Sequence, residues 1–138
     1  MLTKIELAED PELKYNDTFK VDLPINLNKI INNNEYCILK FSANWCKPCK
    51  KLTKEIDKLI DEYEIKNCIL ININYDKHEN IFENIGILKM PTIIFIRNNN
   101  IIKKYNSSLI SDFKETISEI IIEKPGNIKE NIEIIQDF

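Results

Sequence analysis

Three short segments rich in apolar residues, at 36–42, 68–74 and 92–96, constrain what this chain can fold into more than any other feature. Each has the length of one strand, and residues 36–42 are almost continuously apolar. Strands of this kind are buried on both faces, which requires helices above and below the sheet. The chain therefore predicts an α/β fold.

Amphipathic helical patterns separate these strands. In the longest, at about 46–63, apolar residues recur at spacings of three and four; they are Cys49, Leu52, Ile56, Leu59, Ile60 and Tyr63. A shorter apolar pattern at 81–85 predicts a second helix, and another at about 112–123 predicts the last one. Asp112 and Glu115 have the spacing of a capping box at the start of that last helix.

Two further features complete the predicted sheet. Residues 18–23 alternate in character as a short strand does, and Pro24 stands where a helix over about 25–31 can begin. The asparagines at 98–100 turn the third apolar strand into a hairpin with residues 101–105. The order β-α-β-α-β-α-β-β-α predicts a central mixed sheet, mostly parallel with an antiparallel hairpin edge, flanked by helices on both faces.

A chain of 138 residues is most simply one domain, which we place at residues 18–124. Residues 1–17 are polar and mixed in character, and we expect them to form a loosely attached N-terminal extension. After the Pro125-Gly126 break, the tail at 125–138 carries isoleucines at helical spacing. We expect this tail to form a short helix that packs on the domain or on a partner.

Composition excludes several classes of protein. With 43% hydrophobic and 30% charged residues and only 2 glycines, the chain is neither disordered nor collagen-like. No apolar run approaches the ~20 residues of a membrane span, which excludes an integral membrane protein. The 19 basic and 22 acidic side chains are interspersed without a basic stripe, so we expect no nucleic-acid partner. The N-terminus lacks the apolar core of a secretory signal, and we expect a cytoplasmic protein without a membrane partner.

One CxxC motif stands between a predicted buried strand and the long helix: Trp45-Cys46-Lys47-Pro48-Cys49. A helix start presents unpaired N–H groups and the positive end of the helix dipole, so we expect Cys46 to be exposed and its pKa to be lowered. Cys49 follows one turn later on the core side, and Pro48 stiffens the loop between the cysteines. The two sulfurs can therefore alternate between a dithiol and a disulfide.

The other cysteines and the single histidine offer weaker alternatives. A structural zinc site normally needs two CxxC pairs, or one pair with histidines. Only Cys37, Cys68 and His78 remain, and none belongs to a second CxxC, so we expect no metal. We interpret Cys37 and Cys68 as buried inert thiols at the start of neighbouring strands, with a second redox pair as the alternative. His78 is expected at the surface or as a helix cap.

Two motifs in the chain together resemble the thioredoxin family. They are Phe-Ser-Ala-Asn-Trp-Cys-Lys-Pro-Cys-Lys at 41–50 and, after a further strand and helix, Met90-Pro91-Thr92. The resemblance covers about residues 18–124 and implies the thioredoxin fold and a thiol-disulfide oxidoreductase. It implies no metal or organic cofactor, because the two cysteines themselves take up and give away the electrons as they pass between disulfide and dithiol. The implied partners are protein disulfides and an electron donor, either a thioredoxin-reductase-like protein or a glutathione-type thiol, and we expect a monomer.

The resemblance also assigns roles to individual residues. Cys46 matches the attacking cysteine, and Cys49 matches the resolving one, which releases the reduced substrate from a mixed disulfide. Pro91 matches a cis-proline that faces the disulfide, and Met90 would offer its backbone to a bound substrate strand. The implied substrate-binding surface comprises Trp45, Met90, Pro91 and Thr92.

Lys40 and Lys47 depart from the family pattern. Lys40 stands where the family usually has a buried aspartate that accepts the proton of the resolving cysteine. It either extends to the rim of the fold or lies near Cys49 as a cation or a neutral amine. Lys47 replaces the usual glycine between the cysteines, and its charge predicts a reduction potential less negative than about −270 mV, because it favours the thiolate. The lost aspartate and the added tail keep a non-catalytic thioredoxin-fold interaction module as the alternative.

Overall fold

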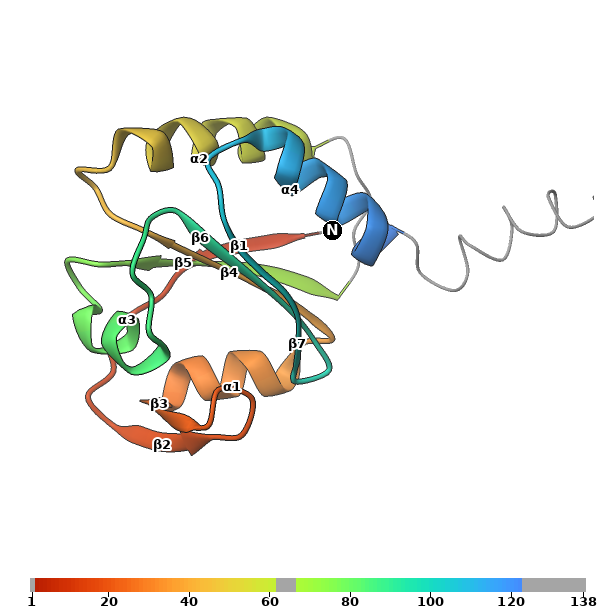
Figure 1. Ribbon diagram of the computed structural model, residues 1–138. Helices are drawn as coiled ribbons and strands as arrows, with labels where there is room; N and C mark the ends of the chain where they lie inside the picture. Colours follow the sequence, from red (N-terminus) through yellow and green to blue (C-terminus); the bar gives the residue numbers. More distant parts are fainter. Residues whose placement is uncertain (1, 62–66, 123–138) are drawn as a thin grey trace, which may run out of the picture.

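The computed structural model describes residues 2–61 and 67–122, which are built around a five-stranded sheet (Figure 1). The strands lie in the order β1 (Thr3–Glu6), β5 (Cys68–Asn74), β4 (Tyr36–Ser42), β6 (Thr92–Arg97) and β7 (Asn100–Asn106). β1, β5 and β4 pair in parallel, whereas β6 pairs antiparallel with β4 and β7 antiparallel with β6. Four of the five strands thus run in one direction, which confirms the predicted mixed, mostly parallel sheet with a hairpin edge.

Helices cover both faces of this sheet (Figure 1). α1 (Ile25–Asn33) and α3 (Glu79–Ile85) lie on one face, and α2 (Lys47–Ile60) and α4 (Ile110–Ile117) lie on the other. α4 continues as a π-helical stretch, η1 (Ser118–Ile122). None of the described helices is long and apolar enough to cross a membrane. The predicted tail helix at 125–138 lies outside the described residues.

Alternation along β4 sends successive side chains into two separate cores. Tyr36 and Ile38 join the core under α2 and α4, whereas Cys37 and Phe41 join the core over α1 and α3. Each of these side chains is at most 1% exposed, so β4 is buried on both faces as its composition predicts. The same alternation places Lys40 on the α2 side of the sheet, at the end of the strand that leads into the CxxC motif.

The prediction that residues 1–17 form a loosely attached extension is wrong. β1 is an edge strand of the main sheet, with Ile5 opposite Ile71 of β5. Leu2 and Leu7, on either side of β1, are buried. The sequence hides this strand because an edge strand exposes most of its side chains and so carries polar residues. The N-terminal residues therefore belong to the folded unit.

The predicted strand at 18–23 is shorter and later than expected. β3 (Val21–Pro24) pairs with β2 (Leu13–Asn16) in a separate two-stranded antiparallel sheet. The residues between the two strands form a turn in which Lys20 has a positive φ of 59°. Asn16 stabilises this turn, since its Oδ1 accepts a hydrogen bond from the Phe19 N–H at 2.8 Å.

The predicted capping box at Asp112 and Glu115 is also wrong. α4 begins at Ile110, and Leu109 precedes it without a side-chain hydrogen bond to the helix. Asp112 instead accepts a hydrogen bond from the Ser107 hydroxyl, whose oxygen accepts from the Leu109 N–H at 3.1 Å. The loop before the helix thus satisfies the Leu109 N–H, one of the two N–H groups that a capping box would have bonded.

Candidate active site

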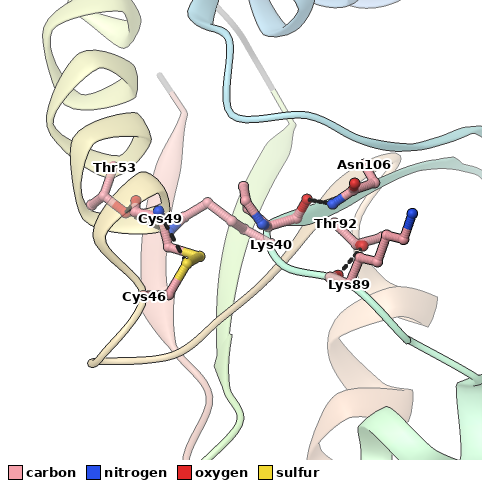
Figure 2. Close-up of a disulfide and its surroundings, with 8 residues drawn as sticks. Lys40, Cys46, Cys49, Thr53, Lys89, Thr92 and Asn106 are labelled. Carbon is pink, nitrogen blue, oxygen red and sulfur yellow. Dashed lines mark hydrogen bonds between the residues drawn. A yellow bond between two sulfur atoms is a disulfide. The ribbon is translucent and has the colours of Figure 1, made fainter.

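The turn from β4 into α2 brings two sulfur atoms together at one end of the sheet. Cys46 and Cys49 form a disulfide, with their Cα atoms 5.2 Å apart (Figure 2). Cys46 caps α2, and the Cys49 N–H donates to its Sγ at 3.3 Å. Pro48 fits the first turn because a backbone N–H at that position would have no partner in the helix. The motif therefore forms the helix start that its sequence predicts.

Exposure distinguishes the two cysteines. Cys46 keeps 8% of its surface exposed, and Cys49 keeps 2%. The prediction of an exposed Cys46 is therefore wrong, because it is buried in the small cluster with Ala43 and Cys49, but it is the more accessible of the two cysteines. The N–H groups at the start of α2 and the helix dipole stabilise negative charge, so this geometry favours a thiolate at a reduced Cys46. Lys47, exposed in the same turn, adds a positive charge.

The loop that leads into β6 lies beside this disulfide, and its Met90–Pro91 peptide bond is cis, as the resemblance implies. Met90 packs against the cluster that contains the two cysteines. Asn106 Nδ2 donates to the Pro91 carbonyl at 2.7 Å, and the Thr92 hydroxyl donates to the Lys89 carbonyl at 2.6 Å (Figure 2). Thr92 is implied to bind substrate, yet it is only 5% exposed, so its side chain holds the loop in place.

Trp45 presents an apolar surface next to the CxxC pair. It is 62% exposed, and its indole N–H donates to Asp76 Oδ1 at 3.2 Å. Its ring packs edge-to-face with that of Tyr75, with the ring centroids 6.3 Å apart. Asp76 and Tyr75 directly follow β5, whose carboxyl end lies beside that of β4 in the parallel sheet. Leu88, which is 93% exposed, adds apolar surface in the loop before Met90. An exposed tryptophan held by its N–H is well suited to contact a partner.

Lys40 is buried beside the backbone of Cys49. It is 2% exposed, and its Nζ donates to Thr53 Oγ1 at 2.6 Å. Thr53 lies one turn after Cys49 in α2, and its hydroxyl donates to the Cys49 carbonyl at 2.9 Å (Figure 2). Burial lowers the pKa of Lys40 to about 8, against the opposite effects of Glu6 and Asp57. Of the predicted alternatives for Lys40, extension to the rim is therefore wrong.

A cavity of about 290 Å³ adjoins these residues, and its lining includes Cys49, Lys40, Thr53, Glu6 and Asn72. Glu6 lies opposite Asn72, and Asn72 lies opposite Lys40, across β1, β5 and β4. These three side chains form a polar row (Glu6, Asn72 and Lys40) on the α2 side of the sheet. Elsewhere this face carries the apolar core under α2 and α4. Polarity is thus concentrated at the end of the sheet where the disulfide lies.

Cys37 and Cys68 lie in cores on opposite faces of the sheet, at 1% and 3% exposure. This geometry excludes the alternative of a second redox pair. His78 is buried as well, and its Nε2–H donates to the Leu7 carbonyl at 2.9 Å without a side-chain bond to α3. The predicted surface position of His78 is therefore wrong, whereas the predicted capping position is confirmed: His78 is the N-cap residue of α3, although it caps through its backbone carbonyl and not through its ring. No group of metal-binding side chains occurs within the described part of the chain.

Thr53 and Asp76 are site residues that were not predicted from the sequence. Thr53 stands four residues after Cys49, and this helical spacing is the signal that places it one turn along the same helix. Asp76 follows the second apolar strand, and the carboxyl ends of parallel strands meet at one edge of a sheet. Glu6 gives no such signal, because the sequence does not predict the strand that carries it.

The helix-capping disulfide beside a cis-proline, on a mixed sheet covered by helices, defines an α/β protein with a dithiol–disulfide site. Comparison with known families leads to the same class, since the model of the family described as Thioredoxin matches residues 19–121. The chain belongs to the thioredoxin family, and its architecture is the thioredoxin fold. A CxxC pair at disulfide distance in this family supports a general thiol-disulfide oxidoreductase.

Several known proteins are similar to this chain. Thioredoxin-T of Drosophila melanogaster is 25% identical over 103 residues, which are 72% of this chain and 65% of that protein, so the chain spans less than two thirds of its length. The thioredoxin of Chlorobaculum thiosulfatiphilum is 31% identical over 81 residues, 59% of this chain and 74% of that protein. The crystal structure of the reduced Schistosoma mansoni thioredoxin pre-protein has a TM-score of 0.67 at 24% identity, covering 86% of this chain and 99% of that chain. This last likeness shows the fold.

Proposed function

We propose that this protein is a thiol-disulfide oxidoreductase that reduces or exchanges protein disulfides through Cys46 and Cys49. The observation that carries the proposal is the disulfide at the start of α2, where the Cys49 N–H points at the Cys46 sulfur. A disulfide between residues one turn apart constrains the unfolded chain little, which argues against a purely structural role. A helix start, in contrast, activates a thiol for exchange.

The proposed reaction comprises two exchanges. The Cys46 thiolate attacks one sulfur of the substrate disulfide and forms a mixed disulfide, while the other substrate sulfur leaves as a thiolate. The Cys49 thiolate then attacks Cys46 Sγ, forms the intramolecular disulfide and releases the second substrate thiolate. Two electrons thus pass to the substrate, whose sulfurs take up two protons, and the protein is left oxidised. The dithiol of Cys46 and Cys49 carries these electrons, so the cycle uses no metal or organic cofactor.

The surface around the disulfide suits an extended polypeptide. Trp45 supplies an exposed aromatic ring, and the Met90 backbone, next to cis-Pro91, can pair with a bound substrate strand. Thr92 contributes by holding this loop. We further propose that the protein acts as a monomer in the reducing cytoplasm. Its electron donor would be a thioredoxin-reductase-like protein or a glutathione-type thiol.

A non-catalytic interaction module is the second candidate function. The observation that favours it is Lys40, a lysine at the position where the family usually has a proton-accepting aspartate. In this alternative the surface around Trp45 binds partners and the disulfide stays closed. The two functions differ in whether binding is followed by exchange at Cys46.

Reduction of insulin by dithiothreitol, followed as turbidity, tests the proposal. We expect the wild-type protein to accelerate precipitation and the Cys46→Ser variant to lose the acceleration, because its nucleophile is gone. Cys49→Ser should accumulate a mixed disulfide with an insulin chain, visible by mass spectrometry under non-reducing conditions. Cys37→Ala is the matched control and should keep full activity. An inactive wild type, or a Cys46→Ser variant as active as the wild type, would contradict the proposal.

A further inference from the structure

Lys40 and Cys49 line one cavity behind the disulfide, and this placement bears on the second exchange. Building on the proposed function, we propose that the Lys40 amine accepts the proton that the Cys49 thiol must lose before it attacks Cys46. A thiol attacks only as its thiolate. Because Cys49 is 2% exposed, it has little direct access to bulk water as a proton acceptor. The exchange therefore requires a base on the inner side of α2, which is where Lys40 lies.

Two hydrogen bonds fix the Lys40 amine relative to Cys49. The Thr53 hydroxyl gives its hydrogen to the Cys49 carbonyl at 2.9 Å, so a lone pair of its oxygen accepts from Lys40 Nζ at 2.6 Å. Thr53 is thus a positioning residue that ties the end of the Lys40 side chain to the backbone of the resolving cysteine. The cavity of about 290 Å³ that all three residues line has room for water molecules that relay a proton.

Lys40 lacks the partner that a structural buried lysine would need. Within the described residues the ion pairs are Lys4–Asp57 and Arg97–Glu35, and neither includes Lys40. A buried ammonium is unfavourable without a carboxylate, whereas a neutral amine is satisfied by its hydrogen bond to a hydroxyl. With a pKa of about 8, roughly one Lys40 in ten is neutral at pH 7. An ordinary lysine is neutral in fewer than about one molecule in a thousand.

The charged groups around the amine come from β1 and α2: Lys4 and Glu6 on the strand, and Lys50, Lys54 and Asp57 on the helix. Burial has the largest effect on the pKa of Lys40 and lowers it. Among the charged groups, Glu6 and Asp57 raise this pKa and Lys4 lowers it. The residues opposite Lys40 on β5 and β6, Asn72 and Ile93, carry no charge. The amine can therefore gain and lose a proton near neutral pH.

The proposed step balances in protons and electrons. The Cys49 thiol gives its proton, through the relay, to the Lys40 amine, which leaves a thiolate and an ammonium group that line the same cavity. The thiolate attacks Cys46 Sγ, forms the intramolecular disulfide and breaks the bond between Cys46 and the substrate sulfur. That sulfur departs with the electron pair and takes up a proton from the ammonium or from water. Lys40 is thereby returned to the amine when it protonates the leaving sulfur, and when water protonates that sulfur, Lys40 returns to the amine by losing its proton to water.

Single-turnover reaction of the reduced protein with dithiobis-nitrobenzoate, one molecule per site, separates the two exchanges. Attack by Cys46 releases the first coloured thiolate, and resolution by Cys49 releases the second. We expect Lys40→Met and Lys40→Arg to slow the second release at pH 7 by about 100-fold, the lower range for a lost proton acceptor. The first release should be nearly unchanged. Arginine keeps the positive charge but stays protonated, so it cannot accept the Cys49 proton.

Two further variants complete the test. Lys40→Asp restores a proton acceptor with the opposite charge and should return most of the rate of the second release. Lys54→Met removes a charge from the rim of the same cavity and should behave as the wild type. A Lys40→Arg variant that resolves as fast as the wild type, or a Lys40→Asp variant slower than Lys40→Met, would show that charge alone matters and would overturn the inference. No first release in the wild type would overturn the proposed function as well.

Discussion

The chain holds four cysteines in two settings that differ in backbone structure. Cys46 and Cys49 lie one turn apart at a helix start and are joined by a disulfide. Cys37 and Cys68 stand near the beginning of two paired strands, in cores on opposite faces of the sheet. Proximity in a sheet thus does not bring two thiols together, because strand neighbours offset by one residue point to opposite faces. Backbone conformation decides which pair can exchange.

Solvation separates the two settings further. Burial raises the pKa of Cys37 to about 12, and its thiol lies 3.7 Å from the Ile30 carbonyl, to which it can donate. Both features favour the protonated, unreactive form. At Cys46 the N–H of Cys49 instead points at the sulfur and favours the thiolate. The same residue type is therefore held inert in a core and activated at a helix start.

Alkylation of the reduced protein tests this contrast most directly. At pH 7 we expect iodoacetamide to modify Cys46 at least about 1,000-fold faster than Cys37, because a pKa near 12 leaves almost no thiolate in comparison with an ordinary thiol near 8.5. Peptide mass spectrometry over a time course measures both rates. In urea the four cysteines should react at similar rates, which controls for intrinsic reactivity. Comparable labelling of Cys37 and Cys46 in the folded protein would break the contrast.

The sequence predicted the central strands and the hairpin edge well, and the N-terminal edge strand not at all. β4 (Tyr36–Ser42) and β5 (Cys68–Asn74) coincide with the predicted 36–42 and 68–74, because a fully buried strand is a short apolar run with sharp ends. β1 escaped prediction because Lys4 and Glu6 face the polar end of the α2 side, and a partly exposed edge strand tolerates them.

The candidate site divides in the same way between local and tertiary features. Cys46 and Cys49 were predicted from one short motif whose geometry is fixed by a few consecutive residues, and Pro91 was implied by the resemblance to the thioredoxin family. The state of Lys40 could not be predicted, because it depends on Thr53, on burial under α2 and on an edge strand far away in the sequence. Protonation of a buried group is a property of its whole environment.

Lys40 extends the comparison to an amine. Burial lowers the pKa of Lys40, whereas it raises the pKa of Cys37, because in both cases it disfavours the charged form. The pKa of Lys40 falls from 10.5 to about 8, so the unfolded chain binds more protons between these pH values and stability rises with pH there. We expect Lys40→Met to be more stable than the wild type at pH 7 by up to about 3 kcal/mol, and this difference should shrink towards pH 10. Urea unfolding of the oxidised proteins measures it.

Comparing the two proteins at each pH cancels the titration of groups that they share, such as Cys37. Lys54→Met is the control, because Lys54 is exposed and its variant should show no pH-dependent difference from the wild type. A difference between Lys40→Met and the wild type that stays constant from pH 7 to pH 10 would contradict a lowered pKa at Lys40. Such a constant difference in stability would reflect the packing of the methionine alone.

Lys47 gives the smallest and most specific test of the contrast between the two settings. Its exposed charge in the first turn of α2 should stabilise the Cys46 thiolate, and hence the reduced protein, by about 0.5–1 kcal/mol. Since about 30 mV corresponds to 1.4 kcal/mol for this couple, Lys47→Gln should lower the reduction potential by about 10–20 mV. Equilibration with glutathione measures the potential, and the wild type should lie above about −270 mV.

The matched control is Lys58→Gln, because Lys58 lies in the last turn of the same helix, far from the sulfurs along its axis. Added salt should reduce the Lys47 effect, since exposed charges are screened over about 10 Å at 0.1 M ionic strength. Equal shifts for both variants would mean that net charge, and not the position of Lys47, sets the potential. A Lys47→Gln variant with an unchanged potential would instead assign the activation of Cys46 to the backbone N–H groups and the dipole of α2, a helix start that the strand residues Cys37 and Cys68 do not occupy.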